Sequence, residues 1–175
     1  MPTKKTKRKP RSTSITTVVL CDLENLHHSA QEALGTSKRT RWERIQDTAV
    51  SLKAAHRHLS AVDDTASVRG IAVADWGRLN SYTPDIAHVG WHPVHVGGKG
   101  TGKNAGDIAL VIEAVKLAVT LRKKHRFVIM SGDSDFVPLV AYLHQQGHEV
   151  WCIAIPGSIS QALIDAVDCV LPVSA

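Results

Sequence analysis

Cysteines and long apolar runs are scarce in this sequence. Only three of the 175 residues are cysteines, and Cys21, Cys152 and Cys169 form no C-x-x-C pair, so neither a disulfide framework nor a thiolate zinc site is indicated. No run approaches the roughly 20 apolar residues of a membrane-spanning helix, and the charged start of the chain leads into a strand-like run rather than a signal peptide. We therefore predict a cytoplasmic protein that does not enter a membrane.

Acidic residues are fewer than basic ones, but the imbalance belongs to one end of the chain. The sequence has 21 Lys and Arg against 16 Asp and Glu, a formal net charge of +5. Six of the basic residues lie in the first eleven positions, and without them 15 basic against 16 acidic residues leave −1. We predict a disordered tail over residues 1–14, which either binds a polyanion without sequence preference or only aids solubility. Residues 15–175 have enough apolar content, at 43% of the chain, to form one domain.

Apolar, strand-like runs alternate with helical patterns after the tail. Strands are predicted at residues 15–21, 67–76, 91–96, 127–130 and 149–155, with a last segment at 167–171. Helices are predicted at residues 41–59, 107–124, 136–146 and 160–166. Such alternation implies right-handed crossovers and a mostly parallel sheet covered by helices on both faces, which is a three-layer α/β/α fold.

Four carboxylates lie at or near the carboxyl ends of these predicted strands. They are Asp22, Asp107, Asp133 and Asp135. Open α/β sheets bind ligands at that edge, and clustered oxygen ligands suit hard cations such as Mg²⁺ or Mn²⁺. A cation held there can activate water and neutralise charge on a phosphoryl oxygen. We therefore predict a metal-dependent site that hydrolyses phosphodiesters.

Several polar residues near these acids have two interpretations each. Asn25 could position a scissile phosphate or simply shape a turn, and Asp135 could bind metal or cap a helix. Glu113 could support the metal site from a distance or pair with a cation. The spacing of His88, His92 and His95 suggests zinc, but a fourth tetrahedral ligand is not evident.

Three motifs resemble those of NYN domains, in the LabA-like branch of the PIN-like nuclease superfamily. They are D-L-E-N at residues 22–25, K-N-A-G-D at 103–107 with Glu113, and S-G-D-S-D-F at 131–136. The resemblance spans about residues 15–173 and implies a parallel sheet of order 3-2-1-4-5 between helices. It also implies RNA cleavage with Mg²⁺ or Mn²⁺ at Asp22, Asp107, Asp133 and Asp135, with Asn25 beside them. Gly106 and Glu113 depart from the residues that the family often has at those positions.

The glycine-rich segment at residues 97–104 nearly matches a phosphate-binding P-loop. Asn104 stands where the motif needs Ser or Thr to ligate Mg²⁺, so we favour a basic loop in which Lys99 and Lys103 contact the RNA backbone. The predicted function is a metal-dependent ribonuclease whose partner is single-stranded or structured RNA. The alternative is a catalytically inactive RNA-binding or protein-interaction module of the same fold. A homodimer is left open.

Overall fold

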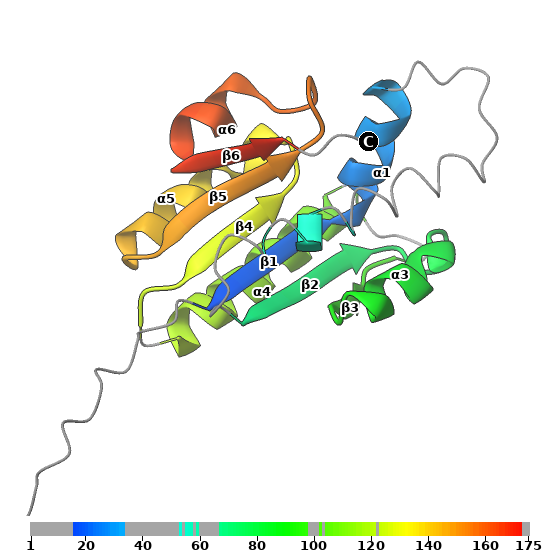
Figure 1. Cartoon of the computed structure of the whole chain (residues 1–175), viewed down its shortest axis with the longest axis horizontal. Coiled ribbons are helices and arrows are strands. Elements are labelled where there is room, and N and C mark those ends of the chain that lie inside the picture. The colour runs from blue at the N-terminus through cyan, green and yellow to red at the C-terminus, as the bar shows by residue number, and fades with distance from the viewer. Residues whose placement is uncertain are drawn as a thin grey trace, which may run out of the picture.

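The computed structural model describes residues 16–33, 53, 55–57, 59, 67–97, 102, 104–121 and 123–172. Within them, six strands form one sheet of order β3-β2-β1-β4-β5-β6, and every neighbouring pair is parallel (Figure 1). The strands are β1 (Thr17–Asp22), β2 (Val68–Ala74), β3 (His92–His95), β4 (Arg126–Met130), β5 (Glu149–Ala154) and β6 (Cys169–Pro172). The predicted α/β fold and the order of its first five strands are confirmed, and the last predicted segment forms a sixth strand at the edge.

Helices cover both faces of the sheet. Helices α1 (Leu23–Ala33) and α3 (Thr83–His88) pack on one face, over a core that includes Leu26 and Ile86. The other face carries α4 (Ala105–Thr120), α5 (Val137–Gln145) and α6 (Gln161–Ala166), which enclose the second core. Figure 1 shows α4 and α5 behind the sheet. All six residues of β1 are buried, as expected for a central strand that is covered on both sides.

The carboxyl ends of the parallel strands all lie at one edge of the sheet. β1 pairs with β2 on one side and with β4 on the other, so the carboxyl end of β1 lies in the middle of that edge. The chain then enters α1 directly, whereas after β4 it passes through a short 3₁₀ helix, η2 (Ser134–Phe136), before α5. Both connections therefore deliver polar residues to the same side of the molecule.

Two helices differ from the sequence interpretation. No helix was predicted at residues 23–33, but they form α1, in which Leu23, Leu26 and Ala30 lie three or four residues apart and are all buried. The turn-rich piece after β2 contains η1 (Asn80–Tyr82) and α3. Its proline occupies the first turn of α3, where a missing N–H costs nothing.

Some predictions fall largely outside the described residues. The tail at residues 1–14 lies there, as does most of the helix expected at 41–59; of the latter, residues 53, 55–57 and 59 are helical. No helix among the described residues has the length and apolar character needed to span a bilayer.

Candidate active site

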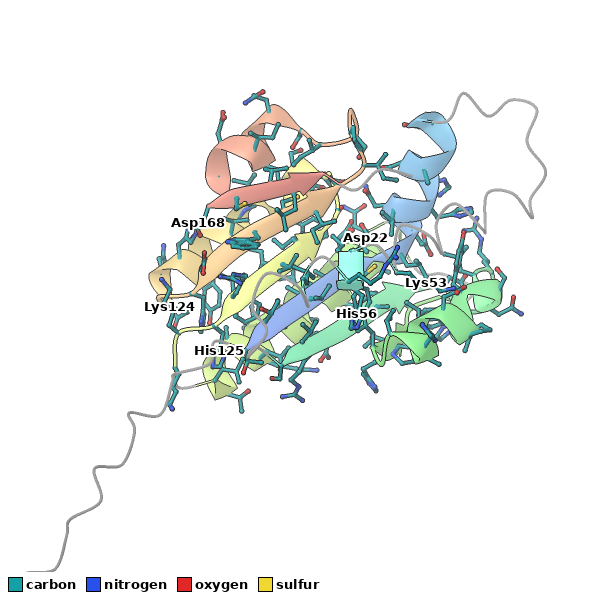
Figure 2. The ribbon with its side chains drawn as sticks, in the orientation of Figure 1. Asp22, Lys53, His56, Lys124, His125 and Asp168 are labelled. Carbon is teal, nitrogen blue, oxygen red and sulfur yellow. The ribbon has the colours of Figure 1, made fainter. Side chains whose placement is uncertain are left out.

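Asp22, the last residue of β1, is held by a hydrogen bond on each carboxylate oxygen. The backbone N–H of Asn25 donates to Oδ1 at 3.1 Å, and the Ser131 hydroxyl donates to Oδ2 at 3.4 Å. Asp22 is only 8% exposed, and Figure 2 shows it at the end of β1 where α1 begins. The bond to Asn25 caps the first turn of α1, so the strand end and the helix start share one carboxylate.

Burial and neighbouring charges raise the pKa of Asp22 to about 6. Burial has the largest effect, and the charges of Asp107 and Glu24 raise the pKa further, while the hydrogen bonds from Asn25 and Ser131 lower it. A cation bound next to Asp22 would favour the ionised carboxylate and so would oppose this increase in pKa. Asp22 is therefore suited to a site that gains a positive charge.

Asp107 connects Asp22 to the other predicted acids. It lies in the first turn of α4, and its pKa is raised first by burial and then by the charges of Asp133, Asp135 and Glu24. Its charge in turn raises the pKa of Asp22. The structure thus brings the four predicted acids to one edge of the sheet, where they repel one another.

The loop after β4 is organised around Ser131 and Asp133. The Asp133 N–H donates to the Ser131 hydroxyl at 3.3 Å, and the Asp135 N–H donates to Asp133 Oδ1 at 2.9 Å. Asp133, not Asp135, is therefore the N-cap of η2, which corrects the sequence interpretation. Asp135 lies inside η2 with an exposed side chain.

Asn25 lies in the first turn of α1 rather than in a loop, and it connects this helix to the β4 loop. Its Oδ1 accepts hydrogen bonds from Gly132 N at 3.2 Å and from the Ser29 hydroxyl at 3.5 Å. Because the oxygen is engaged, the amide NH₂ group is the part of Asn25 that can donate to a ligand.

A polar groove of about 430 Å³ opens beside Asn25 and Asp133. Hydroxyl groups dominate its far wall, which is formed by Ser158 and Ser160 in the loop between β5 and α6. The Ser160 N–H donates to Gly132 O at 2.9 Å, so this wall is fixed to the β4 loop. Of the four predicted acids, Asp133 alone lines this groove, together with Glu32.

Glu24 and Asp75 belong to the acidic edge but were missed in the sequence. Glu24 Oε1 accepts from the Asp75 N–H at 3.1 Å, and Asp75 Oδ1 accepts from the Gly77 N–H at 3.0 Å. A Cβ on Gly97 would lie 2.6 Å from Asp75 Cγ, so the glycine-rich segment starts directly against this acid. The signal was available, because Asp75 follows β2 as Asp133 follows β4.

Other predicted residues lie elsewhere. Glu113 pairs with Lys116 at 2.7 Å, which is one of the two roles predicted for it. His95 accepts a hydrogen bond from the Trp76 N–H, and no zinc site is present among the described residues. Lys99 and Lys103, with most of the glycine-rich segment, lie outside the described residues.

The chemistry of this edge fits a hard divalent cation. Its side-chain donors are carboxylate oxygens, and none of the ion pairs among the described residues neutralises Asp22, Asp107, Asp133 or Asp135. Within the described ranges, no three His, Cys, Asp or Glu side chains are already arranged to hold one ion. Binding would therefore require side-chain rotation, which the exposed Asp135 allows most readily.

An all-parallel sheet of this order is consistent with a PIN-like fold. The family model of the NYN domain matches residues 16–174, and the chain belongs to the NYN domain family. A search of curated proteins gave no match. One similar solved structure is that of a protein of unknown function from Vibrio parahaemolyticus RIMD 2210633, with a TM-score of 0.68 and 18% identity, covering 94% of this chain and 96% of that chain. At this identity, the likeness shows the fold alone.

Ser131→Ala is expected to shift the pH dependence of cation binding. The substitution removes a hydrogen bond that lowers the pKa of Asp22, so protons compete with the cation up to a higher pH. We expect the gain in melting temperature from Mn²⁺ to appear at higher pH than in wild type, which thermal unfolding between pH 5 and 8 measures. Ser134→Ala, in the same loop but exposed, is the control. Identical pH profiles for both variants would show that Ser131 does not act through Asp22.

Proposed function

We propose that the chain is a metal-dependent ribonuclease that hydrolyses RNA phosphodiester bonds at the carboxyl edge of its sheet. The observation that supports this most strongly is the proximity of the four acids: the charge of Asp107 raises the pKa of Asp22, and the charges of Asp133 and Asp135 raise the pKa of Asp107. Carboxylates crowded together without a neutralising partner cost stability, and such arrangements are concentrated at functional sites. Membership of the NYN family, whose fold is of nuclease type, agrees with this use.

In this proposal the four acids hold Mg²⁺ or Mn²⁺, which supplies charge neutralisation and activation of water. Asn25 orients the substrate, because its oxygen is fixed by Gly132 and its NH₂ group can donate to a phosphate oxygen. The RNA strand would lie in the groove beside Asp133. Lys99 and Lys103 would contact the RNA backbone from the glycine-rich segment.

The second candidate is an inactive RNA-binding or protein-interaction module. It is favoured by one observation: the described acids are not already arranged in a group of three around an ion position. The two functions differ in whether RNA is cut when Mg²⁺ or Mn²⁺ is supplied.

A cleavage assay with two matched variants tests the proposal. End-labelled single-stranded and structured RNAs are incubated with wild type, Asp107→Asn and Glu113→Gln in Mn²⁺ or Mg²⁺, and with wild type in EDTA. We expect Asp107→Asn to lose at least about 100-fold in rate, since even outer-sphere partners of metal ligands cost 10–100-fold. Glu113→Gln changes an acid of the same helix that pairs with Lys116 and should cut normally. Cleavage that survives EDTA, or that is equal in both variants, would contradict a metal-dependent site here.

A further inference from the structure

A second pocket, of about 340 Å³, lies away from the acidic edge and is lined mainly by cationic and imidazole side chains. Its lining residues are Lys53, His56, Arg57, His88 and Val89. The first three are helical, as are all the described residues at 53 and 55–57, and the last two come from the end of α3 and the position after it. Figure 2 shows Lys53 and His56 over the part of the sheet formed by β1 and β2.

A buried tryptophan packs against His56, one of the residues that line the pocket. Trp91, only 3% exposed, lies across β2 at Gly70, where an added Cβ would fall 2.1 Å from the indole ring. The His56 ring meets this indole edge-on, with a centroid separation of 6.3 Å. Burial and then the charge of His88 lower the pKa of His56, so its ring is a neutral, flat surface at neutral pH.

The rim of the pocket offers donors to an anion. Arg57 is exposed and uses its Nε–H to donate to Lys53 O at 3.4 Å, which leaves its two terminal NH₂ groups as donors. Lys53 pairs with Asp85 at 2.8 Å and keeps 43% of its side chain exposed, so Asp85 cancels one of the two permanent charges. Arg57 forms no ion pair within the described part of the chain. The net charge at the rim is therefore positive.

The position of the pocket relates it to the acidic edge. Gly70, beneath Trp91, pairs with Val19, whereas Asp22 pairs with Val73. The three-residue offset corresponds to about 10 Å along the strands. The pocket lies on the face of the sheet that α1 and α3 cover, beside the core that contains Trp91.

We propose that this pocket binds the phosphate of a nucleotide, with Arg57 as the main donor, Lys53 and His88 beside it, and the His56 ring as a surface for the base. Guanidinium groups bind phosphate through paired hydrogen bonds, and bases stack on flat rings. The nucleotide is assigned to an RNA strand whose scissile bond lies at the acids, and this assignment rests on the proposed function. Outside the first eleven residues the chain carries a net charge of −1, so it does not attract RNA as a whole. An RNA strand that reaches the acidic edge therefore needs local cationic side chains along its path.

Binding measured in EDTA tests this site separately from catalysis. A fluorescein-labelled oligoribonucleotide is titrated by polarisation against full-length wild type, Arg57→Glu, His88→Ala and Lys123→Glu, and AMP and inorganic phosphate are titrated by calorimetry. Lys123 is an exposed cation in the connection between α4 and β4 and does not line the pocket, so Lys123→Glu makes a charge reversal elsewhere. We expect RNA affinity to fall about 10-fold in Arg57→Glu and less in His88→Ala. The slope of log affinity against log salt should shrink by about 0.7 for the lost phosphate contact.

The competing outcomes are distinct. If AMP binds wild type and not Arg57→Glu, a free nucleotide also binds in the pocket. If Arg57→Glu weakens the binding of RNA alone, the bound phosphate belongs to an RNA strand. Equal RNA and AMP binding by Arg57→Glu and Lys123→Glu would overturn the site. If RNA cleavage requires Mn²⁺ and proceeds at the same rate in wild type and Arg57→Glu, the ribonuclease proposal stays intact. Arg57-dependent binding without any cleavage would instead remove the ribonuclease proposal and keep the pocket.

Discussion

Asp22→Asn is expected to stabilise the metal-free protein at pH 7 by about 2–3 kcal/mol. The folded state raises the pKa of this carboxyl from 3.8 to about 6, so ionised Asp22 favours the unfolded chain. The cost is absent below about pH 3.8, grows between about pH 4 and 6, and is fully present above. Asparagine keeps an oxygen for the Asn25 N–H and carries no charge. Urea denaturation in EDTA at pH 7 and pH 4 measures the difference, which should nearly disappear at pH 4.

The same substitution should reverse its effect when Mn²⁺ is present, because wild type gains the free energy of ion binding and the variant gains much less. Asp165→Asn, at an exposed position of α6, should change stability little at either pH. A loss of stability in Asp22→Asn at pH 7 without metal would contradict the raised pKa.

Gly132→Ala is expected to destabilise the fold by about 3 kcal/mol or more. An added Cβ at Gly132 would lie 2.0 Å from the carbonyl oxygen of Ser158 and 3.0 Å from Ile159 Cα, which are backbone atoms that cannot rotate away. The clash should also separate Gly132 from its hydrogen-bond partner Ser160. Thermal or urea unfolding measures the loss.

Gly106→Ala is the matched control for this substitution. Gly106 lies in the first turn of α4, and the nearest atom to an added Cβ, Val96 Cγ2, is 4.0 Å away. Alanine should be neutral there or stabilise by about 0.5 kcal/mol, because it is the better helix former. Equal effects of the two alanines would show that the close approach at Gly132 is relieved by movement of the loop.

The acidic edge could be predicted because the residues next to each acid in the sequence show where it lies relative to a strand or helix. Each predicted acid stands at the end of an apolar run, in the segment that follows one, or in the first turn of a helix, and parallel strands bring such positions to one edge. The same rule would have included Asp75 if the strand predicted at 67–76 had ended at Ala74, as β2 does. The strand order depended on the family resemblance, because apolar runs alone do not specify which strands are neighbours.

The remaining features depend on contacts between distant segments. The Ser131 hydroxyl reaches Asp22 across 109 residues, and the need for glycine at position 132 comes from the backbone of Ser158. The residues that flank Ser131 and Gly132 in the sequence do not indicate that Asp22 and Ser158 are their partners. Helix α1 was missed for a different reason, since its polar residues between Leu23 and Ala30 resemble a loop when the buried spacing is overlooked.

The direct passage from β1 into α1 determines how a ligand can approach. Asn25 is three residues from Asp22, so one inserted residue would turn its amide by about 100° around the helix axis and take it away from Gly132. The sheet and the acids would be unchanged by such an insertion, but the NH₂ group would face another direction. The length of this connection therefore sets the side from which a phosphate meets the Asn25 amide, independently of how strongly the carboxylates attract a cation.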